Sequence, residues 1–449
     1  MPDVMKIYNH FPVTVQNAAC TLKGMSVRHK RYSPYFMKKW KQFQKTGTYS
    51  YEQVKEYQDK KLKKLLIHSY ETVPYYKKEF DDYGFNPYRF QHADEMAVLP
   101  ILTKDVLKEH IQEFLSSARL SSKTFIHLTG GTTGKALTYY TTLHEQEIQW
   151  AVWWRYRNGL GIRMGDWCAE FGSKAVVPPE WKKAPYWRFD YAEHRKFFSP
   201  YHLNADTVRN YAEGLCGVKW VHGYTSKLAD MAYWLVQNGI VIPMEHITAG
   251  AENLYDTQKK LIEQAFGNRV YQHYGLTEGA ANFSQKRDGR LRVDEDFCYV
   301  EFVNSGREQA VVGTPLHYYR MPLIRYAAGD YARLSENQDG GFRIVEALHG
   351  RDSEYIVTNR GTKITAVEFD EEIFAKVSHA AEAQVVQKSR DELEIRVIRM
   401  DGYTVADEEM LMRRLNEIVG RGMKYTVSYP EELERAENGK FKMVVRNDI

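Results

Sequence analysis

The sequence is poor in cysteine and has no long apolar run. Its four cysteines, Cys20, Cys168, Cys216 and Cys298, lie far apart and form no C-x-x-C pair. The spacing patterns of zinc fingers and dithiol redox sites are therefore missing, and no zinc site is predicted. Sparse cysteine suits a reducing cytoplasm. No stretch of about 18 apolar residues predicts a membrane-spanning helix, and no signal-peptide segment is recognisable at the N-terminus, so we expect a cytoplasmic protein.

The composition is that of a globular protein with more than one domain. The chain has 449 residues, 43% of them hydrophobic and 27% charged, which is too long for one ordinary core and too apolar for a disordered chain. Its net charge of +4 conceals an asymmetry, because residues 1–70 hold 14 Lys and Arg against 4 Asp and Glu. This basic region could rest on anionic lipid headgroups, as a peripheral protein at a membrane, or on an acidic partner. A solvated helical face is the alternative, and no nucleic-acid-binding motif is present.

The hydrophobic pattern predicts an α/β protein. Residues 51–80 have helical spacing, and Pro74 should end that helix. From about residue 97, short apolar runs alternate with amphipathic stretches, as in layered α/β folds. Strand ends followed by glycine are expected at three places, where open α/β sheets bind ligands: 218–223, 247–252 and 270–275.

Two domains are predicted. Residues 1–350 would form a large α/β domain whose first 100 residues are mainly helical and basic. Residues 351–449 would form a small α+β domain, with strands at 383–388 and 392–398 and a helix at 407–419.

The clearest chemical motif is a loop rich in glycine and threonine. Its glycines let the backbone approach a ligand, and successive N–H groups can bind an anion. Its hydroxyls and its lysine can donate to phosphate oxygens. The loop does not match the Walker P-loop pattern, and an ordinary hairpin turn is the alternative reading. It consists of Thr129, Gly130, Gly131, Thr132, Thr133, Gly134 and Lys135.

Four further segments add to this loop. Glu278 follows the strand end at 271–275 and could bind Mg²⁺, which prefers oxygen ligands. Asp330 ends a predicted Gly-Asp turn and suits ribose hydroxyls, although such a residue can simply cap a turn. Arg351 precedes the small domain, and Lys440 lies near the C-terminus, where it could reach a phosphate. A surface ion pair and a solvated tail are the plain alternatives for these two.

In order and spacing, these motifs resemble the adenylate-forming superfamily of acyl-CoA ligases and adenylation domains. Within it, the chain is most similar to the phenylacetate–CoA ligase branch and its CapK-like capsular-polysaccharide proteins. The resemblance covers about residue 50 to the end, and the segments 70–76 and 222–228 match that branch in particular.

The resemblance implies roles for individual residues. Thr129 to Lys135 would hold the ATP phosphates, and Gly250, Ala251, Glu252 and Tyr274 would frame the adenine. Thr277 would contact the α-phosphate, Glu278 would bind Mg²⁺, and Asp330 would bind the ribose with Arg351 close by. Lys440 would be the catalytic lysine of adenylation, with Thr277 and Glu278 as the other catalytic residues.

The sequence also departs from the pattern of the branch. Ala136 follows the loop lysine where proline is usual, and Ala327-Ala328 replaces a common Arg-Thr pair. Residues near 351–353 would form the hinge, but which one pivots is open. Lys442 competes with Lys440 as the catalytic lysine, and we favour Lys440 because it directly follows glycine.

The implied reaction is ATP-dependent activation of a carboxylic acid as an acyl-adenylate, followed by transfer to an acceptor. An amine or amino sugar in surface polysaccharide biosynthesis, the thiol of coenzyme A, and a hydroxyl that takes AMP are the open acceptors. A non-catalytic nucleotide-binding homologue in a polysaccharide assembly complex is the alternative of another class. A homodimer is compatible with the branch. Side chains that could line the acid pocket or pack in the core are Trp153, Trp154, Phe171, His222 and Tyr224, and His127 and His273 could be structural or ligating.

Overall fold

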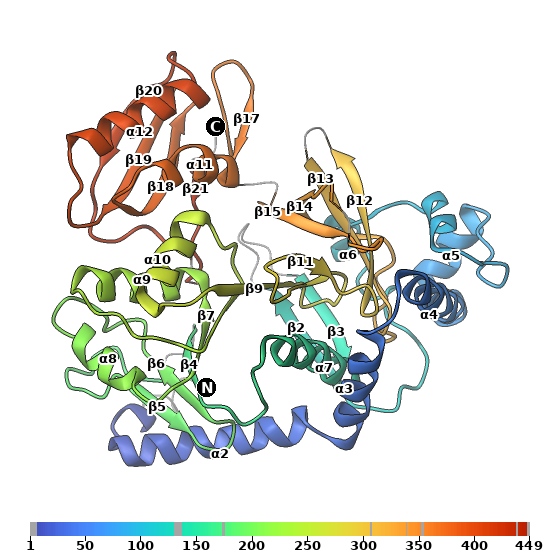
Figure 1. The fold of residues 1–449 in the computed structure, drawn as a ribbon. Helices are drawn as coiled ribbons and strands as arrows, with labels where there is room; N and C mark the ends of the chain where they lie inside the picture. The colour runs from blue at the N-terminus through green and yellow to red at the C-terminus, as the bar shows by residue number, and fades with distance from the viewer. Residues whose placement is uncertain are drawn as a thin grey trace. The chain divides into compact units, whose positions relative to one another are not determined.

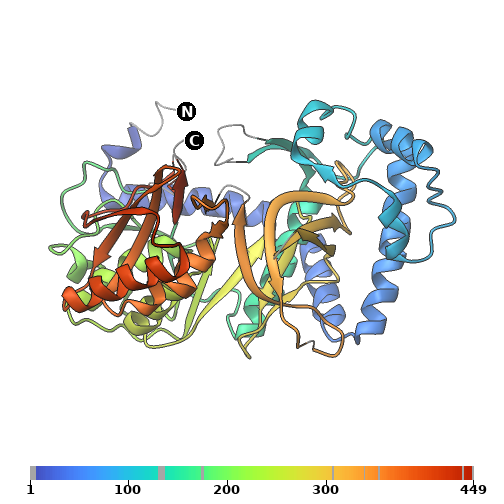
Figure 2. The same cartoon turned by 90° about the horizontal axis from the view of Figure 1, so that it is seen from above.

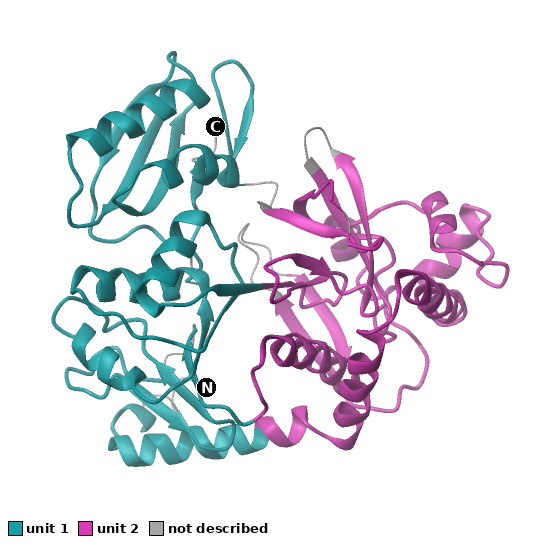
Figure 3. Ribbon diagram, viewed as in Figure 1, with its two compact units in different colours: residues 1–26, 165–272, 349–449 teal, residues 27–164, 273–348 magenta. Residues whose placement is uncertain are grey.

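The computed structural model describes residues 7–129, 137–172, 176–305, 308–337, 339–351, 354–436 and 439–446. The chain forms two compact units, coloured in Figure 3. Unit 1 comprises Met1–Ser26, Gly165–Gln272 and His349–Ile449, and unit 2 comprises Val27–Met164 and His273–Leu348. The predicted boundary near residue 350 remains a prediction.

Unit 1 contains a largely parallel sheet with helices between its strands. The strand order is β8-β7-β4-β6-β5, and β5 is antiparallel to β6 and lies at the edge. A Cβ at Gly223 would lie 3.2 Å from Leu228 Cδ2 of α9, so α9 packs closely on that face of β7. The elements are β4 (Cys168–Phe171), β5 (Trp187–Asp190), β6 (Arg195–Phe198), α8 (Val208–Leu215), β7 (Trp220–Tyr224), α9 (Thr225–Gln237), β8 (His246–Gly250), α10 (Asp256–Phe266) and β9 (Val270–Gly275).

The C-terminal part of unit 1 is a small α+β assembly. Its four-stranded sheet has the order β20-β19-β18-β21, and α11 and α12 lie on one face of this sheet (Figures 1 and 2). The elements are β16 (Tyr355–Val357), β17 (Lys363–Thr365), α11 (Ala366–Glu372), η2 (Phe374–Lys376), β18 (Ala380–Ser389), β19 (Glu392–Arg399), α12 (Val405–Ile418), β20 (Lys424–Ser428) and β21 (Val444–Arg446).

Polar contacts join this C-terminal part to α9 and α10 within unit 1. Asp370 of α11 accepts hydrogen bonds from Asp256 N at 2.6 Å and from Thr257 Oγ1 at 2.5 Å, and so caps the N-terminus of α10. Gln258 Nε2 donates to Glu382 Oε1 at 2.8 Å, and Tyr233 Oη donates to the backbone oxygen of Arg399 at 3.1 Å. The small assembly is thus held by both helices.

Unit 2 begins with helices that pack on a mixed set of strands. A capping box at Ser50 starts α4, and the chain turns at Val73 before Pro74 opens α5. The apolar faces of these helices, including Leu62, Leu66 and Phe80, enter one buried core. The helices of this part are α3 (Pro34–Thr46), α4 (Tyr51–Thr72), α5 (Pro74–Asp82), η1 (Ala93–Val98), α6 (Lys104–Glu109) and α7 (Leu143–Leu160).

The strands of unit 2 form an antiparallel sheet and a separate hairpin. The sheet has the order β12-β13-β14-β15-β11-β10-β9, with β1 parallel to β14. In the hairpin, β2 pairs with β3 so that Thr129 lies opposite Leu137. The strands are β1 (Leu102–Thr103), β2 (Thr124–Thr129), β3 (Leu137–Thr142), β10 (Asn282–Gln285), β11 (Leu291–Val293), β12 (Cys298–Ser305), β13 (Glu308–Pro315), β14 (Tyr326–Leu334) and β15 (Ile344–Arg351).

The structure confirms the predicted α/β class with a small C-terminal α+β part. The helix predicted over 51–80 is present as α4 and α5, divided at Pro74 as expected. The three predicted strand ends correspond to β7, β8 and β9. The Gly-Asp turn predicted at Asp330 is wrong, because Asp330 lies inside β14. Among the described residues, none of the helices has the length and apolar character needed to cross a membrane.

Candidate active site

In unit 2, Asp330 is presented by an irregularity in β14. Ala327 pairs with Val312 and Tyr331 pairs with Ala310, so three residues of β14 face a single residue of β13. Gly329 within this bulge has φ +87°, a conformation that glycine adopts readily. The bulge places the Asp330 carboxylate where Tyr274 Oη donates to Oδ2 at 2.7 Å. Two residues assigned by resemblance to the nucleoside are therefore joined directly.

Thr277 and Glu278 lie in the turn between β9 and β10. The backbone of this turn is anchored at two carbonyls: Tyr139 Oη donates to Thr277 O at 3.2 Å, and Gln149 Nε2 donates to Leu276 O at 3.1 Å. Thr277 is exposed, whereas Glu278 is 8% exposed. Burial raises the pKa of Tyr139, and the nearby Glu278 raises it further. The phenol therefore remains a proton donor at physiological pH.

The same contact joins this turn to the strand that follows the glycine-threonine loop. Tyr139 belongs to β3, and Thr129 is the last residue of β2. Gly130, Gly131, Thr132, Thr133, Gly134 and Lys135 lie outside the described residues. The strands on either side of them, β2 and β3, are paired with each other.

In unit 1, the predicted adenine-framing segment follows β8 directly. Ala251 has φ +68°, which is uncommon for a residue other than glycine. Glu252 accepts hydrogen bonds from Ser226 N at 2.8 Å and Ser226 Oγ at 3.2 Å, at the N-terminus of α9, where a carboxylate is favoured. Glu252 Oε1 also accepts from Phe441 N at 3.0 Å.

Lys440 lies against this segment. Its Nζ donates to the backbone oxygen of Ala251 at 2.9 Å. Lys440 sits in a tight hairpin, in which Ala436 N donates to Lys440 O at 2.9 Å and Gly439 has φ +76°. The adjacent Arg435 donates to Asp230 at 2.7 Å and to Glu382 at 3.3 Å. Unit 1 thus brings together two of the segments that the sequence singled out, and Lys440 is not a solvated tail residue.

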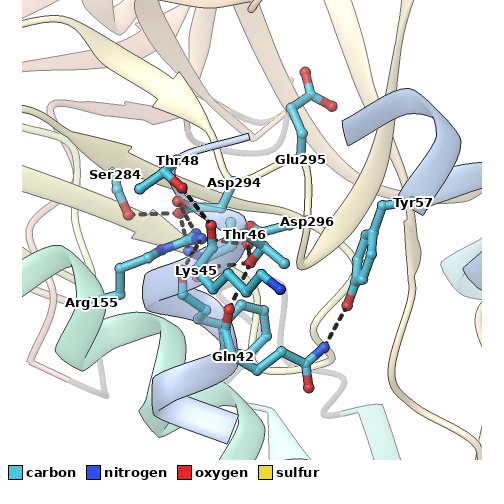
Figure 4. Close-up of polar contacts among 12 residues, drawn as sticks. Gln42, Lys45, Thr46, Thr48, Tyr57, Arg155, Ser284, Asp294, Glu295 and Asp296 are labelled. Atoms are coloured by element: carbon cyan, nitrogen blue, oxygen red, sulfur yellow. Dashed lines mark hydrogen bonds and ion pairs between the residues drawn. The ribbon is translucent and has the colours of Figure 1, made fainter. Parts of the chain in front are cut away.

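A buried polar network lies beneath β9 and β10 in unit 2. Asp294 accepts from Asn282 Nδ2 and Ser284 Oγ, each at 2.6 Å, and from Arg155 Nη2 at 2.8 Å. Arg155 also binds Asp296 at 2.5 Å, as Figure 4 shows. Burial alone would raise the pKa of Asp294, but Arg155 and Lys286 outweigh it, so this pKa is lowered.

This network supports the end of β9. Asn282 pairs with Gly275 in the sheet, and its Oδ1 accepts from Trp153 Nε1 at 3.2 Å. Sequence reasoning missed Arg155, Asn282 and Asp294. The only local signal was the acidic run Asp294-Glu295-Asp296, which is unusual between apolar segments.

Several of the other predicted residues have structural partners. Phe171 stacks on Phe198 with ring centroids 4.8 Å apart and is 1% exposed, and Trp154 donates to Tyr32 Oη at 3.1 Å. His127 contacts Thr141 Oγ1 at 2.7 Å. Burial lowers the pKa of His273 to about 4, which keeps its ring neutral near pH 7.

The acid-pocket candidate His222 lies in the middle of β7. Its Nδ1 is 3.1 Å from the backbone oxygen of Thr248. The same Nδ1 lies 2.9 Å from the hydroxyl oxygen of Thr248, so Thr248 contacts this ring through both its backbone and its side chain. For Tyr224, the other candidate on β7, register places it beside Gly250.

The predicted hinge lies at the end of β15, and the predicted metal ligand is a single carboxylate. Arg351 ends β15, and Asp352 and Ser353 lie outside the described residues. Within the described part of the chain, no group of three or more His, Cys, Asp or Glu side chains is arranged to hold a metal ion. A single carboxylate such as Glu278 is compatible with Mg²⁺, which usually keeps several waters and binds substrate phosphates.

Comparison with known proteins shows similarity to one family model and to two kinds of curated protein. Residues 356–447 match the family model described as the CapK C-terminal domain. Protein CapK of Staphylococcus aureus is 21% identical, and the similarity covers 98% of this chain and 99% of that protein. Phenylacetate-coenzyme A ligase of Thermus thermophilus is 22% identical over 88% of this chain and 96% of that protein. The Escherichia coli phenylacetate-coenzyme A ligase is 24% identical over 83% and 90%, respectively.

A solved structure of 2-hydroxyisobutyryl-CoA ligase in the postadenylation state, in complex with 2-HIB-AMP, has the same fold. Its TM-score is 0.65 at 17% sequence identity, covering 87% of this chain and 89% of that one. These comparisons confirm the family resemblance stated from the motifs. The roles of individual site residues remain predictions.

Proposed function

Because this chain is related over nearly its whole length to CapK, and over most of it to the phenylacetate–coenzyme A ligases, we propose that it activates a carboxylic acid with ATP. The product of the first step is an acyl-adenylate, and pyrophosphate is released. The acyl group then passes to an amine, such as an amino sugar in surface polysaccharide biosynthesis. The chain has the fold of adenylate-forming ligases, which supports this proposal.

The observation that carries this proposal is the contact between Lys440 Nζ and the Ala251 carbonyl at 2.9 Å. The two residues are far apart in the sequence, and resemblance assigns them to the same ligand. An ammonium held beside the adenine-framing segment is suited to an anion at the neighbouring position. Glu252 strengthens this arrangement, because it fixes both the start of α9 and the backbone of Phe441.

In the proposed first step, a carboxylate oxygen of the acid attacks the α-phosphorus. The bond from that phosphorus to the oxygen bridging to the β-phosphorus breaks, and this electron pair leaves with pyrophosphate. Lys440 would exchange the Ala251 carbonyl for the α-phosphate and the acid oxygen, and so offset the charge of two anions brought together. Asp330, held by Tyr274, would bind the ribose hydroxyls, and Thr277 would contact the α-phosphate.

Mg²⁺ would supply charge neutralisation at the phosphates. Glu278 would bind it with one carboxylate, while the phosphates and water complete the ligands. Gly130 to Lys135 would hold the remaining phosphate oxygens through backbone N–H groups and hydroxyls. The acid would lie near the carboxyl ends of the unit 1 strands, where Tyr224 ends β7 and His222 lies two residues before it.

Coenzyme A is the alternative acceptor, supported by the names of the phenylacetate–coenzyme A ligase relatives. A non-catalytic nucleotide-binding homologue is the alternative of another class. The two enzymatic readings share the first step and differ only in the nucleophile. They are separated by adding candidate acceptors after adenylation has been detected.

The test is ATP–pyrophosphate exchange with a panel of carboxylic acids, followed by release assays with amino sugars, amino acids and coenzyme A. Activity with at least one acid is expected, with stimulation by an amine in the absence of coenzyme A. Lys440→Ala should reduce exchange by at least about a hundredfold, the range seen when one preorganised charge partner of a transition state is removed.

Lys442→Ala is the matched control, since it removes an equal charge two residues away. It should retain exchange. Full exchange in the Lys440→Ala variant would contradict the assignment of the lysine. Nucleotide binding without exchange for any acid of the panel would favour the non-catalytic homologue.

A further inference from the structure

The N-terminal helix α2 (Val13–Arg31) presents an unusual inner face to unit 1. Asn17 Oδ1 accepts from Phe189 N at 2.9 Å, and Thr21 Oγ1 accepts from Tyr191 N at 3.2 Å, so polar side chains close the free edge of β5. Gln16 is fully buried and accepts from Arg188 Nε. A Cβ at Gly24 would collide with the Asp190 carboxylate. The side of α2 that meets the protein is therefore mostly polar or small, with Val13 and Val27 as its partly buried apolar residues.

The outer face of the same helix is apolar. Val15, Leu22 and Met25 are 41%, 68% and 57% exposed, and Ala18 is exposed between them. With Phe11 just before the helix, 41% exposed, these residues follow the 4-3-4-3 spacing of a single helical stripe. A helix on the surface of a globular protein normally turns such a stripe toward the core. In α2 this stripe instead faces away from the protein, so its apolar side chains can contact another apolar surface.

Basic residues of the helix border this stripe, and α2 itself contains no acidic residue. At roughly 3.6 residues per turn, Lys23 and Lys30 fall on one side of the stripe and Arg28 on the other. Residues 4–51 contain no Asp or Glu at all. The exposed Tyr191, whose backbone donates to Thr21, adds an aromatic ring beside the helix. An apolar stripe flanked by Lys and Arg is the pattern of a helix lying in a membrane interface.

We propose that α2 docks on an anionic lipid surface, with Val15, Leu22 and Met25 entering the headgroup boundary and Lys23, Arg28 and Lys30 meeting lipid phosphates. A second copy of the chain fits less well. Pairing two such helices would bring their basic borders together, and residues 4–51 offer no carboxylate to neutralise them. This inference does not depend on the proposed reaction.

The test is flotation of the full-length protein with vesicles of phosphatidylcholine alone and of phosphatidylcholine with phosphatidylglycerol. Binding is expected to the anionic vesicles and should weaken as salt rises. Leu22→Asp should reduce binding by about tenfold or more, because a large apolar side chain no longer enters the interface. Lys23→Gln combined with Lys30→Gln should reduce binding to anionic vesicles while leaving the weak binding to neutral vesicles unchanged.

Val241→Asp is the matched control, since Val241 is 58% exposed elsewhere in unit 1; it should bind vesicles like the unchanged protein. Leu22→Gln is the second variant, which removes the apolar group without a negative charge. Equal binding to both vesicle types, or to neither, would overturn the proposal. It would also be overturned if ultracentrifugation showed self-association that Leu22→Gln abolishes, because the stripe would then be a contact between copies.

Discussion

Tyr274 donates its hydroxyl to Asp330 at 2.7 Å, joining the end of β9 to the bulge in β14. The hydrogen bond fixes a carboxylate that a flexible turn would leave free to rotate. If Asp330 binds the ribose, the phenol acts as its positioning partner.

Tyr274→Phe removes only this hydroxyl. The KM for ATP in the exchange assay should rise by about tenfold, consistent with the loss of one hydrogen bond to a charged group, worth roughly 1.5 kcal/mol, while kcat changes less. Tyr211→Phe is the control, because Tyr211 Oη donates to Ser199 O at 2.7 Å in the core of unit 1. It should lower stability with no effect on KM. An unchanged KM for ATP in Tyr274→Phe would remove Asp330 from the nucleoside site.

Glu252 is expected to position Lys440. Glu252→Gln keeps the size of the side chain but removes the charge that Ser226 N and Phe441 N share. Adenylation kcat should fall by about tenfold, since the hairpin that carries the lysine is less firmly held. The KM for the acid should stay the same, and the melting temperature should fall by only a few degrees. Loss of stability without any change of kcat would indicate a purely structural cap.

Gly279 should be required for the turn that bears Glu278. It has φ +74°, and an added Cβ would lie 2.7 Å from Tyr318 Cζ. Gly279→Ala should destabilise unit 2 by about 2 kcal/mol or more, since backbone strain and collision add, and should impair exchange. At Gly84, φ is +64° but the space is open. Gly84→Ala should therefore cost only the strain, about 1 kcal/mol, and leave exchange intact. Urea unfolding measures the free energy of unfolding of both variants. An equal decrease in the two variants would contradict a collision at Gly279.

Much of this architecture was readable from local patterns. Pro74 divides α4 from α5 as predicted because proline cannot continue a helix interior. The Gly-Asp pair at 329–330 signalled a turn, yet the pairing of β13 on both sides keeps it inside a strand. The Gly-Asp pair correctly predicted an irregular backbone here, but it did not predict that this irregularity lies within a strand.

Long-range partners could not be predicted. Asp294 and Asp296 look like solvated charges in the sequence, because their partner Arg155 is 139 and 141 residues away. The contact of Lys440 with Ala251 likewise spans 189 residues. The order of motifs in the sequence can suggest that the segments of Ala251 and Lys440 share a ligand. Only the tertiary packing shows that the Lys440 side chain contacts Ala251.

Stability should also report on Asp370 through its pH dependence. Burial raises the pKa of this carboxyl from 3.8 to about 6. The Asp370 carboxyl therefore binds a proton more tightly in the folded protein than in the unfolded chain. Its contribution to the free energy of unfolding is most favourable below pH 4 and is lost as the pH rises to 6.

Asp370→Asn removes this titration. The difference in unfolding free energy between the unchanged protein and the variant should fall by about 2 to 3 kcal/mol from pH 4 to pH 7. Urea unfolding at several pH values measures it. Parallel profiles for the two proteins would show that Asp370 has an ordinary pKa.

The polar inner face of α2 has one more consequence. Asn17 occupies the backbone donor of Phe189 in β5, and Thr21 that of Tyr191 directly after β5; both would otherwise be open to another strand. Helix α2 thus covers the edge of the sheet and protects it from pairing with the edge of another molecule. A protein truncated past Thr21 would lack this cover. The exposed edge of β5 could then pair with a strand of another molecule, whether or not the truncated protein remains active.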